Sequence, residues 1–219
     1  MSLSSSGLFA AVNTPPTPTG ELKLGDISKQ IPMTKIPTAP GYFMYVKLNE
    51  HPDLVNEGAR LIAERISSLN IQNPYFVTAE ASTIAMAHML RDKYKINGLI
   101  LYKKKQLDDI DPVSITYKAV TSPNEQQLFL GKNKSAALLD KEIIIIDSIC
   151  TTGGTLKGIY DLLIKAGVKP QQIKEATMLF TEGTPLHRIE VSDEKYLNIH
   201  SFSHLPIVQD EPHACSLKN

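Results

Sequence analysis

The residues with the clearest chemical potential follow a run of four isoleucines at residues 143–146. After this run come an acid and then small or hydroxyl-bearing residues: Asp147, Ser148, Thr151, Thr152, Gly153, Gly154 and Thr155. Two adjacent glycines let the backbone fold tightly and approach a ligand. A helix that begins near Gly154 would point its free N–H groups and its positive dipole end at the same place. The segment therefore predicts a phosphate-binding loop, with the Asp147 carboxylate beside it for sugar hydroxyls or for the water shell of a metal.

Two widespread phosphate loops do not match this segment. A Walker A loop requires G-x-x-x-x-G-K-[ST], and the dinucleotide-binding loop requires G-x-G-x-x-G. Residues 153–158 read Gly-Gly-Thr-Leu-Lys-Gly, which fits neither pattern. An ordinary Gly-rich turn between a strand and a helix is the remaining alternative. The apolar run, the acid and the Thr-Thr-Gly-Gly-Thr sequence together favour anion binding over that alternative.

Two further segments can meet an anion. Residues 79–82, Ala-Glu-Ala-Ser, lie between an expected strand and an expected helix. Their backbone N–H groups are available either to a ligand or to an ordinary helix start with Ser82 as the N-cap. Lys103 and Lys104 belong to a run of three lysines after the next expected strand. Such a run either pairs with the aspartates that follow it or faces an anionic ligand.

These groups need a sheet to position them, and the hydrophobic pattern predicts one. Strands are expected at residues 42–46, 75–78, 99–102 and 143–146, and helices at 53–66, 82–94 and 154–167. Strands that alternate with helices are typical of a parallel α/β sheet. Four consecutive isoleucines are typical of a central strand that is buried on both faces. Residues 113–130 surround Ser-Pro-Asn and predict a polar hairpin that projects from the domain.

Residues 143–155 resemble the phosphoribosyl-pyrophosphate (PRPP) binding motif of the type I phosphoribosyltransferases. The resemblance extends over about residues 37–185. It implies an α/β fold in which a parallel sheet is flanked by helices, with a small hood over the base and a flexible β-hairpin loop over the reacting carbon. By this resemblance Asp147 binds a ribose hydroxyl. The 5′-phosphate is then held by Thr151, Thr152, Gly153, Gly154 and Thr155.

The resemblance also assigns groups to the pyrophosphate. Residues Ala79, Glu80, Ala81 and Ser82 are similar to the Glu-Ala-x-Gly pyrophosphate loop of adenine and xanthine phosphoribosyltransferases. Thr83 stands where that family often has glycine. Lys103 and Lys104 occupy the place of a basic run in the adenine enzymes, where they are expected to neutralise the leaving pyrophosphate. Mg²⁺ is the implied cofactor; it is expected to be held through PRPP near Asp147, with no direct protein site.

A base pocket is implied by Pro-Gly-Tyr-Phe at residues 40–43, which resembles a segment of the base pocket in adenine phosphoribosyltransferases. Its expected members are Phe43, Tyr45 and Ile149. Tyr45 replaces an arginine of the family pattern. An aromatic residue in a strand and an isoleucine after one are also ordinary core residues, so Phe43 and Ile149 have two interpretations.

Two departures from the family concern catalysis. The hairpin at residues 113–130 occupies the place of the family's catalytic loop, and Tyr117 aligns with a loop tyrosine. No residue clearly matches the loop acid, and Glu125 is a loose candidate, so the general acid or base is unassigned. Ser148 stands where the family usually has a second acid. A neutral hydrogen bond contributes about 0.5–1.5 kcal/mol and a charge-assisted one about 1.5–3 kcal/mol, so ribose binding is expected to be weaker by about 1 kcal/mol.

Composition sets the context. The 219 residues carry 23 Lys+Arg against 23 Asp+Glu, and this zero net charge lacks the basic excess of a nucleic-acid binder. Cys150 and Cys215 form no CxxC pair, and no segment is long enough to span a membrane, so a soluble cytoplasmic protein is expected. Residues 1–34 predict a Pro/Ser/Thr-rich, flexible or surface-draped leader. Residues 35–219 predict a single domain, with the hood at about 35–50 and in the C-terminal part.

The sequence thus predicts a purine phosphoribosyltransferase of purine salvage. It would transfer the 5-phosphoribosyl group from PRPP to a nucleobase, with adenine favoured and xanthine next. A homodimer is expected because family members are commonly homodimers. The alternative is a catalytically weak or inactive regulator that senses PRPP or a nucleotide, to which Ser148, Tyr45 and the missing loop acid point. The lack of a basic surface or of an added DNA-binding module opposes a role in transcription.

Overall fold

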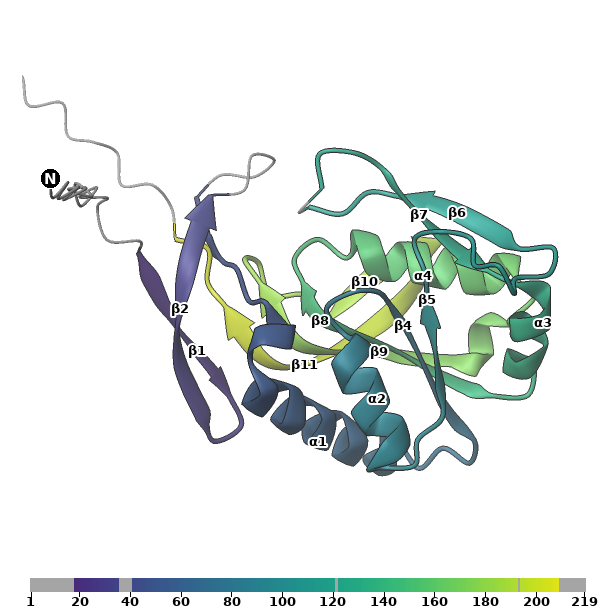
Figure 1. The fold of residues 1–219 in the computed structure, drawn as a ribbon, viewed down its shortest axis with the longest axis horizontal. Helices are drawn as coiled ribbons and strands as arrows, with labels where there is room; N and C mark the ends of the chain where they lie inside the picture. Colours follow the sequence, from purple (N-terminus) through teal and green to yellow (C-terminus); the bar gives the residue numbers. More distant parts are fainter. Residues whose placement is uncertain (1–17, 36–40, 121, 193, 209–219) are drawn as a thin grey trace, which may run out of the picture.

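A six-stranded sheet organises the molecule in the computed structural model, which describes residues 18–35, 41–120, 122–192 and 194–208 (Figure 1). Its strands are β4 (Pro74–Ala79), β5 (Gly98–Leu101), β8 (Glu142–Cys150), β9 (Ile173–Glu182), β10 (Arg188–Ser192) and β11 (Lys195–Leu205). They lie in the order β10-β11-β9-β8-β4-β5. All neighbouring pairs are parallel except β10 and β11. The predicted α/β class with a mainly parallel sheet is confirmed.

Helices cover both faces of this sheet. Helices α1 (Pro52–Ser68) and α2 (Ile84–Asp92) pack on one face, and α4 (Gly154–Lys165) packs on the other (Figure 1). The isoleucine run in β8 explains the arrangement, because successive side chains of a strand point to opposite faces. Ile144 and Ile146 join the core under α1 and α2, whereas Ile143 and Ile145 join the core under α4. All four are fully buried, as expected for a central strand.

Several boundaries differ from the sequence-based expectation. The strand predicted at residues 143–146 continues to Cys150, so Asp147 lies inside β8 and pairs with β9 at Met178. The helix predicted at residues 82–94 is α2, which begins two residues later, at Ile84. The remaining short helices are η1 (Leu48–Glu50), α3 (Lys132–Ser135), η2 (Ala136–Leu138) and η3 (Pro170–Gln172). Within the described residues, no helix combines the length and the apolar character needed to cross a membrane.

A second, three-stranded antiparallel sheet corrects the predicted leader at residues 1–34. It consists of β1 (Thr19–Leu24), β2 (Ile27–Lys35) and β3 (Tyr42–Met44). Leu22 and Leu24 alternate with charged residues along β1 and are buried in the core over α1, so this part of the leader belongs to the folded domain. The prolines and threonines around residues 14–19 masked this period-two pattern. Residues 1–17 of the predicted leader lie outside the described residues.

The two ends of the described chain meet at this small sheet. Val208 pairs with Tyr42 of β3 through backbone hydrogen bonds, so the C-terminal segment adds to the sheet that the N-terminal strands form. Figure 1 shows the sheet beside the carboxyl end of β11. The hood predicted at about residues 35–50 overlaps this small sheet, which begins earlier, at Thr19.

A third element is the hairpin of β6 (Val113–Tyr117) and β7 (Gln126–Leu130), which are antiparallel partners. Its bounds match the hairpin predicted at residues 113–130. Tyr117 is buried against α4, where its side chain fills the space beside Gly158; a Cβ there would lie 2.8 Å from the tyrosine. This packing places the turn of the hairpin above the carboxyl edge of the main sheet (Figure 1).

Candidate functional site

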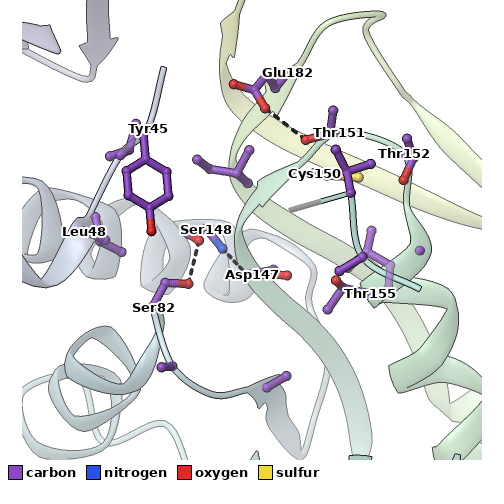
Figure 2. A pocket seen from close by; sticks show the side chains of 18 of the residues that line it. Tyr45, Leu48, Ser82, Asp147, Ser148, Cys150, Thr151, Thr152, Thr155 and Glu182 are labelled. Carbon is purple, nitrogen blue, oxygen red and sulfur yellow. Dashed lines mark hydrogen bonds between the residues drawn. The ribbon is translucent and has the colours of Figure 1, made fainter. Parts of the chain in front are cut away.

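A cavity of about 570 Å³ opens at the carboxyl ends of β4, β8 and β9 (Figure 2). This is the edge at which open α/β sheets bind ligands. Most of the predicted site residues line it: Phe43, Tyr45, Ala79, Glu80, Ala81, Ser82, Lys103, Tyr117, Asp147, Ser148, Ile149, Thr151, Thr152, Gly153, Gly154 and Thr155. Two predicted residues, Lys104 and Glu125, are exposed to solvent and do not line it. The structure therefore brings together segments that lie more than one hundred residues apart in the sequence.

The predicted phosphate loop connects β8 to α4. Gly153 takes a left-handed conformation with φ of +80° and caps α4, whose first residue is Gly154. A side chain at Gly153 would be strained there and would place its Cβ 2.6 Å from Ile189. A Cβ at Gly154 would collide with the backbone carbonyl of Lys118, which follows the hairpin strand β6. The loop thus leaves the first N–H groups of α4 without side chains in front of them, which suits an anion.

Asp147 is the most strongly perturbed acid of the cavity. Burial raises the pKa of its carboxyl group to about 6, while the Ser148 backbone N–H and the charge of Lys103 act in the opposite direction. Its Oδ1 accepts a hydrogen bond of 2.7 Å from that N–H. A carboxylate that is partly desolvated and faces a lysine is well placed to bind polar groups of a ligand that enters the cavity.

Ser148, which replaces the second acid of the family motif, forms a contact between two predicted segments. Its hydroxyl oxygen lies 2.9 Å from the hydroxyl oxygen of Ser82. Ser82 belongs to the turn after β4, so this hydrogen bond joins the neighbouring strands β4 and β8 at their carboxyl ends (Figure 2). The Ser148 hydroxyl is therefore engaged with Ser82.

The turn after β4 is held by its own hydrogen bonds. The Thr83 hydroxyl donates to the Ala79 carbonyl at 2.8 Å and lies 2.8 Å from the Thr78 hydroxyl. The Glu80 carboxylate accepts a hydrogen bond of 2.7 Å from the Lys103 backbone N–H. Glu80 thereby fixes the segment after β5, in which Lys103 lines the cavity.

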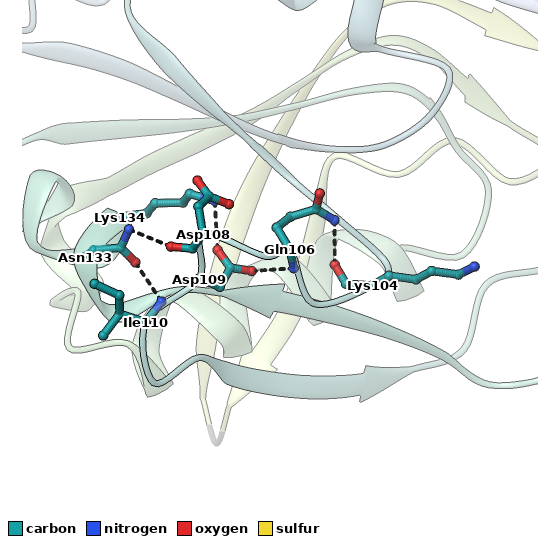
Figure 3. Close-up of polar contacts among 7 residues, drawn as sticks. All are labelled: Lys104, Gln106, Asp108, Asp109, Ile110, Asn133 and Lys134. Atoms are coloured by element: carbon teal, nitrogen blue, oxygen red, sulfur yellow. Dashed lines mark hydrogen bonds and ion pairs between the residues drawn. The ribbon is translucent and has the colours of Figure 1, made fainter.

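Lys103 and Lys104 differ in where they point. Within the described chain neither takes part in a side-chain ion pair, because the neighbouring acids have other partners: Asp108 and Asp109 pair with Lys134, and Asp111 pairs with Lys132. Figure 3 shows the pairs that Asp108 and Asp109 form with Lys134, with the Lys104 side chain extending away from them. The Lys104 backbone carbonyl accepts a hydrogen bond from the Gln106 side chain. Of the two lysines that were predicted to face an anion, Lys103 lines the cavity and remains the candidate.

The hairpin contributes a tyrosine and a glutamine in place of an acid. The Tyr117 hydroxyl donates to the Gln126 side-chain oxygen at 2.8 Å, and both residues line the cavity. Burial, together with the charges of Asp147 and Glu80, raises the pKa of Tyr117 to about 12, so the phenol keeps its proton at neutral pH. The loose candidate for the loop acid, Glu125, is not part of the cavity. Strand β7 begins at Gln126, so Glu125 lies in the turn that precedes it, and its side chain is exposed.

The predicted base pocket lies on the side of the small sheet. Phe43 is buried, Ile149 is half-buried, and Tyr45 is more than half exposed. All three line the cavity, together with Leu48 of η1. Figure 2 shows the Tyr45 ring on the opposite side of the cavity from Thr152 and Thr155. An apolar wall therefore faces the phosphate loop across the cavity, which provides one end for a flat ring and the other for an anion.

Glu182 is a site residue that the sequence reasoning missed. It ends β9, is 4% exposed, and lines the cavity. The Thr151 hydroxyl donates to its Oε2 at 3.0 Å, so the side chain of Thr151 turns toward Glu182 (Figure 2). Burial raises the pKa of Glu182, and the Thr151 hydroxyl and the Met44 backbone N–H partly oppose this effect. An acid two residues after the apolar run at residues 178–180 was the signal that could have identified it.

No all-protein metal site is present among the described residues, where no three His, Cys, Asp or Glu side chains gather. Asp147 and Glu80 supply carboxylate oxygens to the cavity, and oxygen is the ligand that Mg²⁺ prefers. Mg²⁺ commonly keeps several waters and binds through one or two carboxylates together with substrate phosphates. This donor set fits a magnesium ion that is held mainly by a phosphorylated ligand.

The chain is similar to a known protein family and to solved structures. The family model "Phosphoribosyl transferase domain" matches residues 44–209. No curated protein matches the chain. Among solved structures, adenine phosphoribosyltransferase from Thermoanaerobacter pseudethanolicus is similar with a TM-score of 0.60 at 15% identity, over 80% of this chain and 95% of that one. The Giardia lamblia enzyme complexed with 9-deazaadenine gives 0.60 at 17% identity, over 78% and 93%.

A third similar structure is adenine phosphoribosyltransferase from Trypanosoma brucei in complex with AMP, pyrophosphate and ribose-5-phosphate, with a TM-score of 0.56 at 14% identity, over 83% of this chain and 81% of that one. At these identities the structural likeness establishes the fold. The family model covers most of the chain, including the phosphate loop, the turn after β4 and the hairpin. The chain belongs to the phosphoribosyltransferase family.

Proposed function

We propose that the chain is a purine phosphoribosyltransferase of purine salvage that transfers the 5-phosphoribosyl group from PRPP to a nucleobase, with adenine favoured and xanthine next. The observation that carries the proposal is the single cavity in which the phosphate loop, Asp147 and Lys103 lie together. The adenine phosphoribosyltransferases among the similar structures support a purine acceptor. A homodimer is the proposed assembly.

In the proposed reaction a nitrogen of the base forms a bond to the anomeric carbon of PRPP while the bond from that carbon to the pyrophosphate oxygen breaks. Pyrophosphate leaves with the electron pair, and the attacking nitrogen gives up its proton to water or to the departing pyrophosphate. Positive charge develops on the ribose, where the Asp147 carboxylate can stabilise it and hold the ribose hydroxyls. The phosphate loop fixes the 5′-phosphate, which positions the anomeric carbon for attack.

Charge on the leaving group is the second requirement. Lys103 lines the cavity beside Asp147 and is the proposed partner of the pyrophosphate, together with backbone N–H groups of residues 79–82. A magnesium ion held there would supply positive charge that offsets the charge of the leaving pyrophosphate. Asp147 and Glu80 are the residues that would hold it. Tyr117 and Gln126 lie on the hairpin side, where closure would exclude water from the reactive sugar.

The alternative is a regulator that binds PRPP or a nucleotide with little or no turnover. Two observations favour it: Glu125, the candidate acid, lies outside the cavity, and the Ser148 hydroxyl is engaged with Ser82. Both alternatives share the phosphate loop and the apolar wall. They differ in whether pyrophosphate is released.

The deciding experiment measures pyrophosphate release from PRPP and magnesium, with adenine, xanthine, guanine, hypoxanthine and orotate offered one at a time. Release with a purine, and not with orotate, is the expected result. Tight binding of PRPP or of a nucleotide without release for any base would contradict the proposed enzyme and support the regulator. Release with orotate alone would contradict the purine class.

Replacing Ser148 by aspartate is expected to leave PRPP binding equal or to tighten it several-fold in the presence of magnesium. The replacement exchanges a neutral hydrogen bond for a charge-assisted one, a difference of about 1 kcal/mol. Isothermal titration with PRPP and magnesium measures the effect. Ser82→Ala is the matched control, because it removes the contact with Ser148 without adding charge. Weaker PRPP binding in Ser148→Asp than in Ser82→Ala would argue against a ribose next to residue 148.

A further inference from the structure

The Glu182 carboxylate is unevenly satisfied. Its Oε2 accepts the hydrogen bond from Thr151, whereas its Oε1 is buried and makes no hydrogen bond within the described residues. Among the described residues, Oε1 is the only buried side-chain oxygen or nitrogen without a hydrogen-bond partner. Buried polar atoms almost always have partners, and an exception in a cavity wall points to a partner that a ligand supplies.

The position of Glu182 identifies which part of a ligand can reach it. The residue lies between Thr151 of the phosphate loop and the Met44 backbone N–H, which follows the buried Phe43. In the view of Figure 2 the oxygen that is not bonded to Thr151 points toward the side on which Tyr45 lies. Glu182 lines the cavity, and its buried free oxygen is turned to the side of the apolar wall rather than to the hydroxyl of Thr151.

Thr151 fixes this orientation. The last rotatable bond of a glutamate side chain sets the plane of its carboxylate. The hydrogen bond of 3.0 Å from Thr151 to Oε2 restrains this bond, and it thereby restrains the position of Oε1. Burial raises the pKa of Glu182, and the Thr151 hydroxyl and the Met44 N–H act against this rise by stabilising the ionised form. An ionised carboxylate is an acceptor only, so its complement on a ligand is an N–H or O–H donor.

We propose that Glu182 selects the acceptor base by receiving, at Oε1, a hydrogen bond from an exocyclic amino group of the base. An aminopurine supplies this donor. Xanthine presents carbonyl oxygens at both of its exocyclic positions, and their lone pairs face the carboxylate unfavourably. This inference rests on the proposed phosphoribosyltransferase function and deepens it, because it separates adenine from xanthine within the purine class.

The test compares kcat/KM for adenine and xanthine at saturating PRPP and magnesium at pH 7.5. The wild-type protein is expected to prefer adenine. In Glu182→Gln the amide can direct its N–H₂ group into the cavity, so kcat/KM for adenine should fall about 10-fold or more, while that for xanthine should fall less or rise. The ratio of the two values is the decisive readout, because general damage to the fold lowers both values alike.

Two variants serve as references for that ratio. Glu80→Gln removes a different carboxylate of the cavity, on the side proposed for the pyrophosphate, so it should lower kcat/KM for both bases by the same factor. Thr151→Val keeps Glu182 and its charge but removes the donor to Oε2, so it should reduce the preference for adenine only in part. This variant keeps the question open to measurement if Glu182→Gln fails to fold.

The outcomes separate this inference from the proposed function. Equal or better use of xanthine by the wild-type protein, or an unchanged ratio in both Glu182→Gln and Thr151→Val, would overturn the role of Glu182 and leave the enzyme intact. If no base is turned over, the proposed function fails, and equilibrium binding of AMP and XMP tests Glu182 by itself. Tighter binding of AMP that is lost in Glu182→Gln supports the inference, and equal binding of the two nucleotides overturns it.

Discussion

Replacing Asp147 by asparagine is expected to lower kcat/KM for PRPP by about 10- to 100-fold. The carboxylate lies inside the cavity beside Lys103, where it is proposed to hold the ribose hydroxyls. A hydrogen bond to a charged group contributes about 1.5–3 kcal/mol, and each 1.4 kcal/mol changes a binding constant tenfold. Steady-state kinetics with varied PRPP, together with the dissociation constant of PRPP, measure the loss. If the regulator alternative holds, the dissociation constant carries the whole effect.

The same substitution has a second signature in the free energy of unfolding. The pKa of Asp147 is about 6 in the folded chain against an ordinary value of 3.8, so the folded state binds more protons than the unfolded state between these values. Its contribution to stability is therefore present below about pH 4 and is lost as the pH rises through about 6, by at most on the order of 3 kcal/mol. Asparagine does not titrate. Relative to the wild-type protein, Asp147→Asn should therefore gain stability between pH 4 and pH 7.5, as measured by urea unfolding without ligand.

A surface carboxylate provides the control for both measurements. Asp140 is exposed and pairs with Lys141, outside the cavity. Asp140→Asn should leave PRPP binding unchanged and should lack the relative gain in stability at high pH, because the pKa of Asp140 is lowered by Lys141 rather than raised. Full activity in Asp147→Asn would show that the ribose does not lie next to this residue. A gain in stability without a loss of activity would leave the electrostatics of β8 intact and remove the proposed role.

The parts of the fold that depend on local periodicity were predictable. The isoleucine run specified a central strand, and the alternation of strands with helices specified the parallel sheet. The order of segments around the cavity followed, because the turns after β4 and β8 must meet at one edge of a parallel sheet. The assignment of Asp147, Ser82 and Lys103 to one ligand came from the resemblance to the type I phosphoribosyltransferases, and all three line the cavity.

Other features required the three-dimensional structure. Strand β1 is short and lies beside a Pro- and Thr-rich stretch, so the burial of Leu22 and Leu24 depends on a contact with α1 that no local pattern reveals. Glu182 belongs to no recognisable motif in the sequence. Its contact with the phosphate loop is visible only in the structure, where the Thr151 hydroxyl donates to it from the end of the neighbouring strand. The different surroundings of Lys103 and Lys104 arise from the direction of one turn, which a run of identical residues cannot encode.

Lys103 and Lys104 allow a matched comparison, because they are adjacent lysines of which only Lys103 lines the cavity. Lys103→Gln is expected to raise the dissociation constant of PRPP by about 10- to 100-fold, since it removes the charge that is proposed to meet the pyrophosphate. Its backbone N–H still donates to Glu80, so the loop keeps its position. Lys104→Gln, which changes the same charge on an exposed side chain outside the cavity, is expected to change the constant less than about twofold. Titration calorimetry with PRPP and magnesium compares the two variants directly.

Two further measurements decide whether Lys103 acts through direct contact with PRPP or only through its contribution to the net charge. Because Lys103 lowers the pKa of Asp147, its replacement should raise that pKa further, which urea unfolding across pH can detect as a steeper loss of stability between pH 4 and pH 7.5. Lys104→Gln should not alter this profile. The salt dependence of PRPP binding should weaken in Lys103→Gln and stay as in the wild-type protein in Lys104→Gln. Equal losses of affinity in the two variants would mean that the run acts as a diffuse positive surface, and the placement of the pyrophosphate beside Lys103 would then be wrong.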